Sequence, residues 1–108
     1  MGFQKPGGQG IYLDQIEIIF PKTSKELIQV VLRGNLANPC LKIDEPEVDL
    51  EGTTFHIALK TVSTAEACIQ MLEPFEKKIP IEVGDLPAGV YTIDVLGQRK
   101  IFEWKNGE

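Results

Sequence analysis

The residues with the best-defined chemistry in this 108-residue chain are its two cysteines. Cys40 follows the turn-forming pair Asn38-Pro39, and Cys68 follows residues 65–67, Ala-Glu-Ala. An even number of cysteines in a small domain of short β-strands indicates one intramolecular disulfide and an oxidising compartment. The alternative is two buried free thiols, because free cysteine packs as a small hydrophobe. We favour the Cys40–Cys68 disulfide and therefore an extracytoplasmic protein, whether periplasmic, on the cell surface or secreted.

Catalysis by either cysteine would need a base, and the single histidine, His56, is the only candidate. His56 alternates with Phe55 and Ile57 along an expected strand, which places its side chain on the opposite face. A disulfide would also remove the thiolate on which Cys–His catalysis depends. The sequence therefore predicts no catalytic residues, and we do not expect an enzyme.

Metal and phosphate sites lack their usual spacings. The sequence has no Cys-x-x-Cys or His-x-x-x-His pair, and Met71 is too isolated for a thioether copper site. The acidic residues between 44 and 51 alternate with apolar ones and lack the glycine of a Ca²⁺ loop, which is typical of a solvated strand face. The glycines at 7, 8 and 10 neither follow a strand nor open a helix. We expect no metal and no cofactor.

The charge balance limits the possible partners. Eleven Lys and Arg against sixteen Asp and Glu give a net charge of -5. Without a basic cluster, the chain is poorly suited to bind nucleic acid or an anionic membrane surface. No apolar run is long enough to span a membrane, and residues 1–8 lack the apolar core of a signal peptide. We interpret Met1 as standing in place of a removed export signal, and we expect no direct membrane insertion.

Alternation of apolar and polar residues predicts strands through most of the chain after residue 10. Residues 1–10 are rich in glycine and indicate a flexible leader, so residues 11–108 are expected to form one domain. Pro46 and Pro80 lack a backbone donor and indicate strands at sheet edges. The expected strands cover residues 11–20, 26–33, 41–50 with a break near Pro46, 53–62, 79–83, 91–95 and 100–104.

The stretch from Ser63 to Leu72 fits two structures. Ser63 and Glu66 could form a helix capping box, and the apolar residues at 65, 68, 69 and 72 have helical spacing. Alternatively, residues 68, 70 and 72 would share one side of a strand. We favour a strand, because a helix this short is marginal and its surroundings are β. A loop carrying Phe75 is expected at residues 74–78.

The sequence between Leu86 and Val95 has the pattern Leu-x-x-Gly-x-Tyr followed by an alternating strand. This pattern resembles the penultimate strand of immunoglobulin-like sandwiches, and the resemblance implies that the hydroxyl of Tyr91 binds back to the backbone. Together with the cysteines, Pro74-Phe75 and Phe102, residues 25–104 resemble small immunoglobulin-like domains of bacterial envelope proteins and lipoproteins, most of them of unknown function. The only tryptophan, Trp104, follows both cysteines, so an antibody-type core geometry is not implied.

The expected fold is all-β, an immunoglobulin-like antiparallel β-sandwich of about seven strands. Its core should contain the inward-facing residues of the expected strands. They are Ile16, Ile18, Ile28, Val30, Leu32, Ile43, Phe55, Ile57, Leu59, Ile81, Val83, Tyr91, Ile93, Val95, Phe102 and Trp104.

The function that fits this inventory is a monomeric, non-catalytic extracytoplasmic domain acting as a structural spacer or as an interaction module with a protein partner. The alternative is a dedicated binder, similar to a protease inhibitor or a carbohydrate-recognition sandwich, that acts through its end loops. Phe75 and Leu36 are the candidate loop contacts for such a binder. For Phe75, burial against the core is the competing expectation.

Overall fold

The structure is a computed structural model, and it describes residues 10–20, 27–65 and 67–105. Those residues form nine strands and no helix, so the all-β prediction is confirmed, with more strands than expected. The strands are β1 (Ile11–Ile19), β2 (Leu27–Leu36), β3 (Leu41–Ile43), β4 (Glu47–Glu51), β5 (Thr54–Ala58), β6 (Thr61–Ser63), β7 (Glu73–Glu82), β8 (Gly89–Val95) and β9 (Gln98–Trp104). Residues 1–9 of the predicted leader lie outside the described part of the chain.

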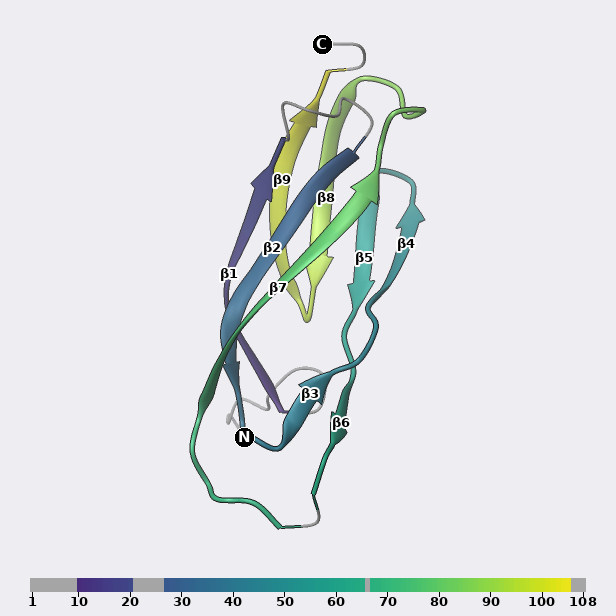
Figure 1. The fold of residues 1–108 in the computed structure, drawn as a ribbon. Helices are drawn as coiled ribbons and strands as arrows, with labels where there is room; N and C mark the ends of the chain where they lie inside the picture. Colours follow the sequence, from purple (N-terminus) through teal and green to yellow (C-terminus); the bar gives the residue numbers. More distant parts are fainter. Residues whose placement is uncertain (1–9, 21–26, 66, 106–108) are drawn as a thin grey trace, which may run out of the picture.

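Two sheets form the layers of a β-sandwich (Figure 1). One has the order β1-β2-β7 and is antiparallel, and the other has the order β4-β5-β8-β9. A small ribbon, β3 paired with β6, extends from the second layer towards one end of the molecule. Within the larger sheet, β5 and β8 run parallel, with Phe55 opposite Ile93. This pair departs from the fully antiparallel pairing that we expected.

Apolar side chains from both sheets meet in one core, as alternation predicted. The predicted core residues are all buried except Ile18 and Ile43, which are partly buried and pack against the core. Five further hydrophobic residues are buried that were not predicted to be. These are Ile11, Leu13, Val31, Leu36 and Ile79.

The two expected strands at 41–50 and 53–62 are each interrupted. A break at residues 44–46 separates β3 from β4, where Pro46 was expected to end the pairing. Residues 59–60 separate β5 from β6 in the same way. The two interruptions face each other, since the amide of Asp44 donates to the carbonyl oxygen of Lys60 at 2.8 Å. The chain therefore continues as a narrow β3–β6 ribbon beyond the four-stranded sheet.

The expectations for residues 63–78 were wrong. Beyond Ser63, which ends β6, the described residues up to Leu72 are neither strand nor helix. Residues 74–78, expected to be a loop, belong to β7, because β7 pairs with β2 without interruption from Leu36–Glu73 to Leu27–Glu82. The ladder with β2 overrides the turn signal of Pro74, which a strand at a sheet edge can accommodate.

The sheet edges agree with the proline positions. β7 is the outer strand of one sheet and contains Pro80, and β4 is the outer strand of the other and follows Pro46. On the opposite side, the side-chain amide of Gln98 donates to the carbonyl oxygen of Leu13 at 2.7 Å and joins the two sheets. The hydrogen bond expected from Tyr91 is also present, and its acceptor is the carbonyl oxygen of Pro87.

Candidate functional site

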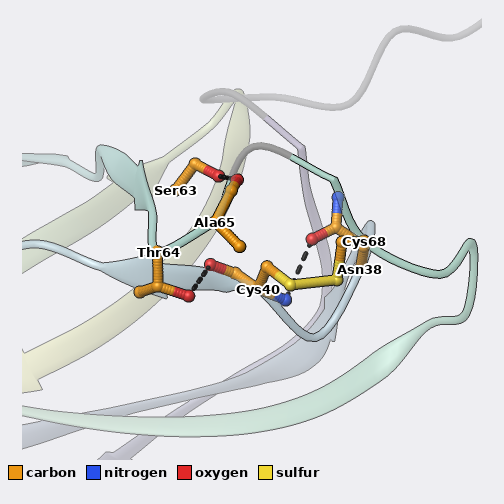
Figure 2. Close-up of a disulfide and its surroundings, with 6 residues drawn as sticks. All are labelled: Asn38, Cys40, Ser63, Thr64, Ala65 and Cys68. Carbon is orange, nitrogen blue, oxygen red and sulfur yellow. Dashed lines mark hydrogen bonds between the residues drawn. A yellow bond between two sulfur atoms is a disulfide. The ribbon is translucent and has the colours of Figure 1, made fainter.

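The predicted disulfide is present between Cys40 and Cys68, whose Cα atoms lie 6.1 Å apart (Figure 2). Cys40 lies directly before β3, and Cys68 lies in the connection between β6 and β7. Both thiols are consumed, so neither is available as a nucleophile or a metal ligand.

The β6–β7 connection is hydrogen-bonded to the segment before β3 at its start. The hydroxyl of Thr64 donates to the carbonyl oxygen of Cys40 at 2.9 Å (Figure 2). The backbone amide of Thr64 donates to the same oxygen at 2.8 Å. The amide of Cys40 in turn donates to Oδ1 of Asn38 at 3.0 Å. For residues 67–72 the structure gives no hydrogen bond or ion pair to the sandwich, so the disulfide is their cross-link to it.

Three apolar side chains follow the disulfide on this connection and are largely exposed. Ile69, Met71 and Leu72 have exposed fractions of 62%, 55% and 56%. We call these three residues the apolar tip. The connection that carries them passes around one end of the sandwich, at the bottom of Figure 1. Single exposed apolar residues are common on proteins, whereas apolar side chains gathered at one place on the surface can mark a contact site.

Phe75 and Leu36, the residues predicted to make loop contacts, lie in strands instead. Leu36 ends β2 and is buried, and Phe75 lies within β7 and packs against the core. They are therefore not loop residues, and Phe75 is partly buried against the core, in agreement with the competing expectation. Both line a shallow groove of about 350 Å³ between β7 and the segment that contains β3. The apolar tip replaces them as the exposed apolar feature of this end.

His56 lies on the outer face of β5 and is partly exposed, as the alternation predicted. Its ring nitrogens are 3.4 Å from a carboxylate oxygen of Glu51 and 3.6 Å from one of Asp94. Asp94 also lies 3.6 Å from the guanidinium of Arg99. Within the described ranges, no group of three His, Cys, Asp or Glu residues is placed to hold a metal ion. These polar side chains form a row on the outer face of the four-stranded sheet.

A second charged row crosses the outer face of the three-stranded sheet. Arg33 on β2 contacts Glu17 on β1 at 2.7 Å and Glu76 on β7 at 2.9 Å. The hydrogen bond to Glu17 is the main reason why the pKa of Arg33 is raised above its ordinary value. All three side chains are well exposed, so solvent and salt screen the row. It orders the sheet surface and offers no reactive group.

The open edge at β7 carries an inward-facing charge. Lys77 is half-buried and shares its side of the strand with Phe75 and Ile79. It lines both the groove described above and a neighbouring hollow of about 190 Å³ beside Pro46 and Val48. No described residue forms a hydrogen bond or ion pair with its side-chain ammonium group. Charges that point inward, like prolines, are means by which proteins keep edge strands from pairing with other chains.

Comparison with known proteins places this architecture in a family. Residues 30–107 match the ORF11 beta-sandwich domain. The chain belongs to that family. The matched region begins within β2 and includes both cysteines, the apolar tip and the whole four-stranded sheet.

One relative of this ORF11 beta-sandwich domain comes from Herpetosiphon aurantiacus. It is an uncharacterized 10.2 kDa protein in the HgiCIIM 5' region, 29% identical over 82 residues, which cover 75% of this chain and 86% of the relative. No solved structure matches the chain significantly. Of the described residues, none belongs to a helix long and apolar enough to cross a membrane.

Proposed function

We propose that this ORF11 beta-sandwich domain is a non-catalytic extracytoplasmic module that binds a protein partner through the end of the sandwich closed by the disulfide. The observation that carries the proposal is the apolar tip, whose three side chains are each more than half exposed. A domain that acted only as a spacer would gain nothing from exposing them, because burying apolar surface is the main favourable term in association. We therefore favour an interaction module over a spacer.

The disulfide supports the extracytoplasmic part of the proposal, because such bonds persist in oxidising compartments. The cross-link also supports a binding role, since it holds a segment that makes no other described bond to the sandwich. A loop held in place before binding loses less conformational entropy on association.

The hydrogen bond from Tyr91 to Pro87 supports the immunoglobulin-like type, since such sandwiches use a tyrosine to tie this corner. The parallel β5–β8 pair distinguishes this domain from the antibody-type arrangement. We therefore propose a variant of the immunoglobulin-like sandwich, of the kind found in bacterial envelope proteins and lipoproteins.

A protein partner fits the apolar tip better than a carbohydrate does. Ile69 and Leu72 carry no polar side-chain atoms, and the Met71 thioether is only a weak acceptor. Sugar hydroxyls placed against them would lose their hydrogen bonds to water without replacement, which is unfavourable. The more specific alternative, a dedicated binder acting through its end loops, would therefore be closer to a protease inhibitor than to a lectin.

Site-specific photo-crosslinking in the source cells tests the proposal. A photoreactive amino acid would replace Met71 in one variant and Val90 in another. Val90 is the matched control, because it is similarly exposed but lies on the outer face of β8. We expect a discrete protein adduct with the Met71 variant and none with the Val90 variant. Fractionation of the same cells should place the protein outside the cytoplasm. Alkylation of free thiols in that fraction should leave both cysteines unmodified, because they are joined in the disulfide. Equal adducts from both positions, or free thiols in a cytoplasmic fraction, would contradict the proposal.

A further inference from the structure

The charges around the apolar tip indicate what kind of partner surface it fits. From Val62 to Glu76 the sequence has no lysine, arginine or histidine, while it has three glutamates, at 66, 73 and 76. Glu76 is engaged by Arg33 at 2.9 Å. Glu73, which directly follows Leu72, is exposed and forms no ion pair with any described residue. The tip therefore carries no positive charge of its own and adjoins a carboxylate without an ion pair. The groove that Glu73 lines also holds Lys42 and, four residues further along β7, Lys77.

A membrane surface is a poor match for this combination. Segments that lie in the lipid interface usually carry lysine or arginine on the polar face and tryptophan, phenylalanine or leucine on the other. The tip has apolar residues but no lysine or arginine, and an anionic lipid surface would repel its acidic border. A protein surface with basic residues around an apolar pocket complements the tip, because the pocket matches its apolar side chains and the basic residues match its acidic border.

The disulfide should matter to this contact because of where it lies. It is the cross-link between the sandwich and residues 67–72, and the tip begins one residue after Cys68. When the bond is broken, the bonds of Thr64 to Cys40 remain at one side and β7 remains at the other. The segment between them is then free to take many conformations, and each must be restricted again on binding.

We propose that the apolar tip docks into an aliphatic pocket of a partner protein that is bordered by lysine or arginine, and that it does so only while the Cys40–Cys68 disulfide is intact. This inference rests on the proposed function and specifies its partner. The pocket receives Ile69, Met71 and Leu72. The basic border pairs with Glu73.

A random peptide library displayed on phage, selected on the immobilised oxidised protein, tests the inference without knowledge of the partner. We expect the enriched peptides to combine aliphatic or aromatic residues with lysine or arginine. Their affinity should fall about tenfold or more for Leu72→Asp and Met71→Asp, since these changes place a charge in the apolar contact. Reduction of the disulfide should also lower the affinity for these peptides.

Two charge reversals provide the matched control. Glu73→Lys and Glu47→Lys change the net charge equally, but Glu47 lies on β4, in the opposite layer and away from the tip. We expect Glu73→Lys to weaken the binding of the basic peptides several-fold. Glu47→Lys should have little effect on their binding. Equal effects of the two reversals, enriched peptides without basic residues, or binding unchanged by reduction would overturn the inference. Tip-dependent sedimentation with vesicles of phosphatidylcholine and phosphatidylglycerol would also overturn it.

The results separate the two proposals. If Met71 crosslinks to a protein in cells while the selected peptides lack basic residues, the proposed function stands and the specified partner surface is wrong. If Met71 gives no specific adduct and no peptide depends on the tip, both proposals fail.

Discussion

The hydroxyl of Tyr91 donates a 2.7 Å hydrogen bond to the carbonyl oxygen of Pro87, four residues earlier in the chain. The ring of Tyr91 is buried and lies against Phe55 and Phe102, with ring centres 6.0 and 5.8 Å away. The indole of Trp104 donates to the neighbouring carbonyl of Leu86 at 3.3 Å. Two buried aromatic residues thus hold the connection between β7 and β8 against the core.

Replacing Tyr91 by phenylalanine should remove the hydrogen bond and keep the ring packing. We expect a loss of about 1 kcal/mol in the free energy of unfolding, the usual value for one hydrogen bond. Urea unfolding followed by tryptophan fluorescence would measure it. Tyr12→Phe is the matched control, because Tyr12 is 43% exposed, and it should leave the midpoint unchanged. A Tyr91→Phe protein as stable as the parent would show that the hydroxyl does not secure this connection.

Removal of the disulfide by the paired change Cys40→Ser and Cys68→Ser should destabilise the domain without changing the fold. The bond closes a loop of 28 residues, for which the chain-entropy model gives about 3.5 kcal/mol. Denaturant unfolding would measure the loss, and chemical reduction of the parent should reproduce it. An unchanged free energy of unfolding would mean that the unfolded chain is already restricted in this region.

Substitution of Gly34 by alanine should be one of the most damaging single changes. A Cβ at this buried position would collide with the backbone carbonyl oxygen of Tyr12 on β1, next to the irregularity between Leu13 and Gln15. Overpacking of this kind typically costs about 1–3 kcal/mol. Thermal unfolding would show the effect. Asn35→Ala, one residue further along the same strand, should shift the melting temperature much less, and equal shifts would argue against the close approach.

Replacement of Lys77 by valine should allow the domain to associate with itself. The change removes an inward-facing charge from the open edge of β7, where it protects against pairing with a second chain. Size-exclusion chromatography with light scattering should show a monomeric parent and a concentration-dependent dimer of the variant. Lys78→Val makes the same change on the exposed side of the strand, and that variant should remain a monomer. A dimeric parent would contradict both this prediction and the proposed monomer.

Residues whose environment is set by local alternation were predictable from the sequence. The inward positions of β2, β5, β8 and β9 were identified because apolar and polar residues alternate there with period two. The tyrosine hydrogen bond was predictable from the resemblance to immunoglobulin-like sandwiches, whose Leu-x-x-Gly-x-Tyr pattern lies within six residues.

Features that depend on strand neighbours were not predictable. The strand expected at residues 26–33 continues through Gly34 in β2, because the missing side chain of this glycine makes room for β1. Pro74 was read as a loop residue, yet the ladder with β2 keeps it in β7. The apolar tip was missed because residues 68–72 alternate like a strand, and only the ends of β6 and β7 show that no neighbouring strand pairs with them.

The parallel pairing of β5 with β8 has a consequence for how the chain is made. As synthesis proceeds from the N-terminus, β1, β2 and β7 can assemble as soon as Glu82 has left the ribosome. β5 then still has only β4 beside it, because its other neighbour, β8, is completed at Val95. Phe55, whose ring lies against Tyr91 and Phe102, therefore completes its packing only when β8 and β9 have formed. Such late, non-local pairings slow folding and leave apolar surface exposed in the growing chain.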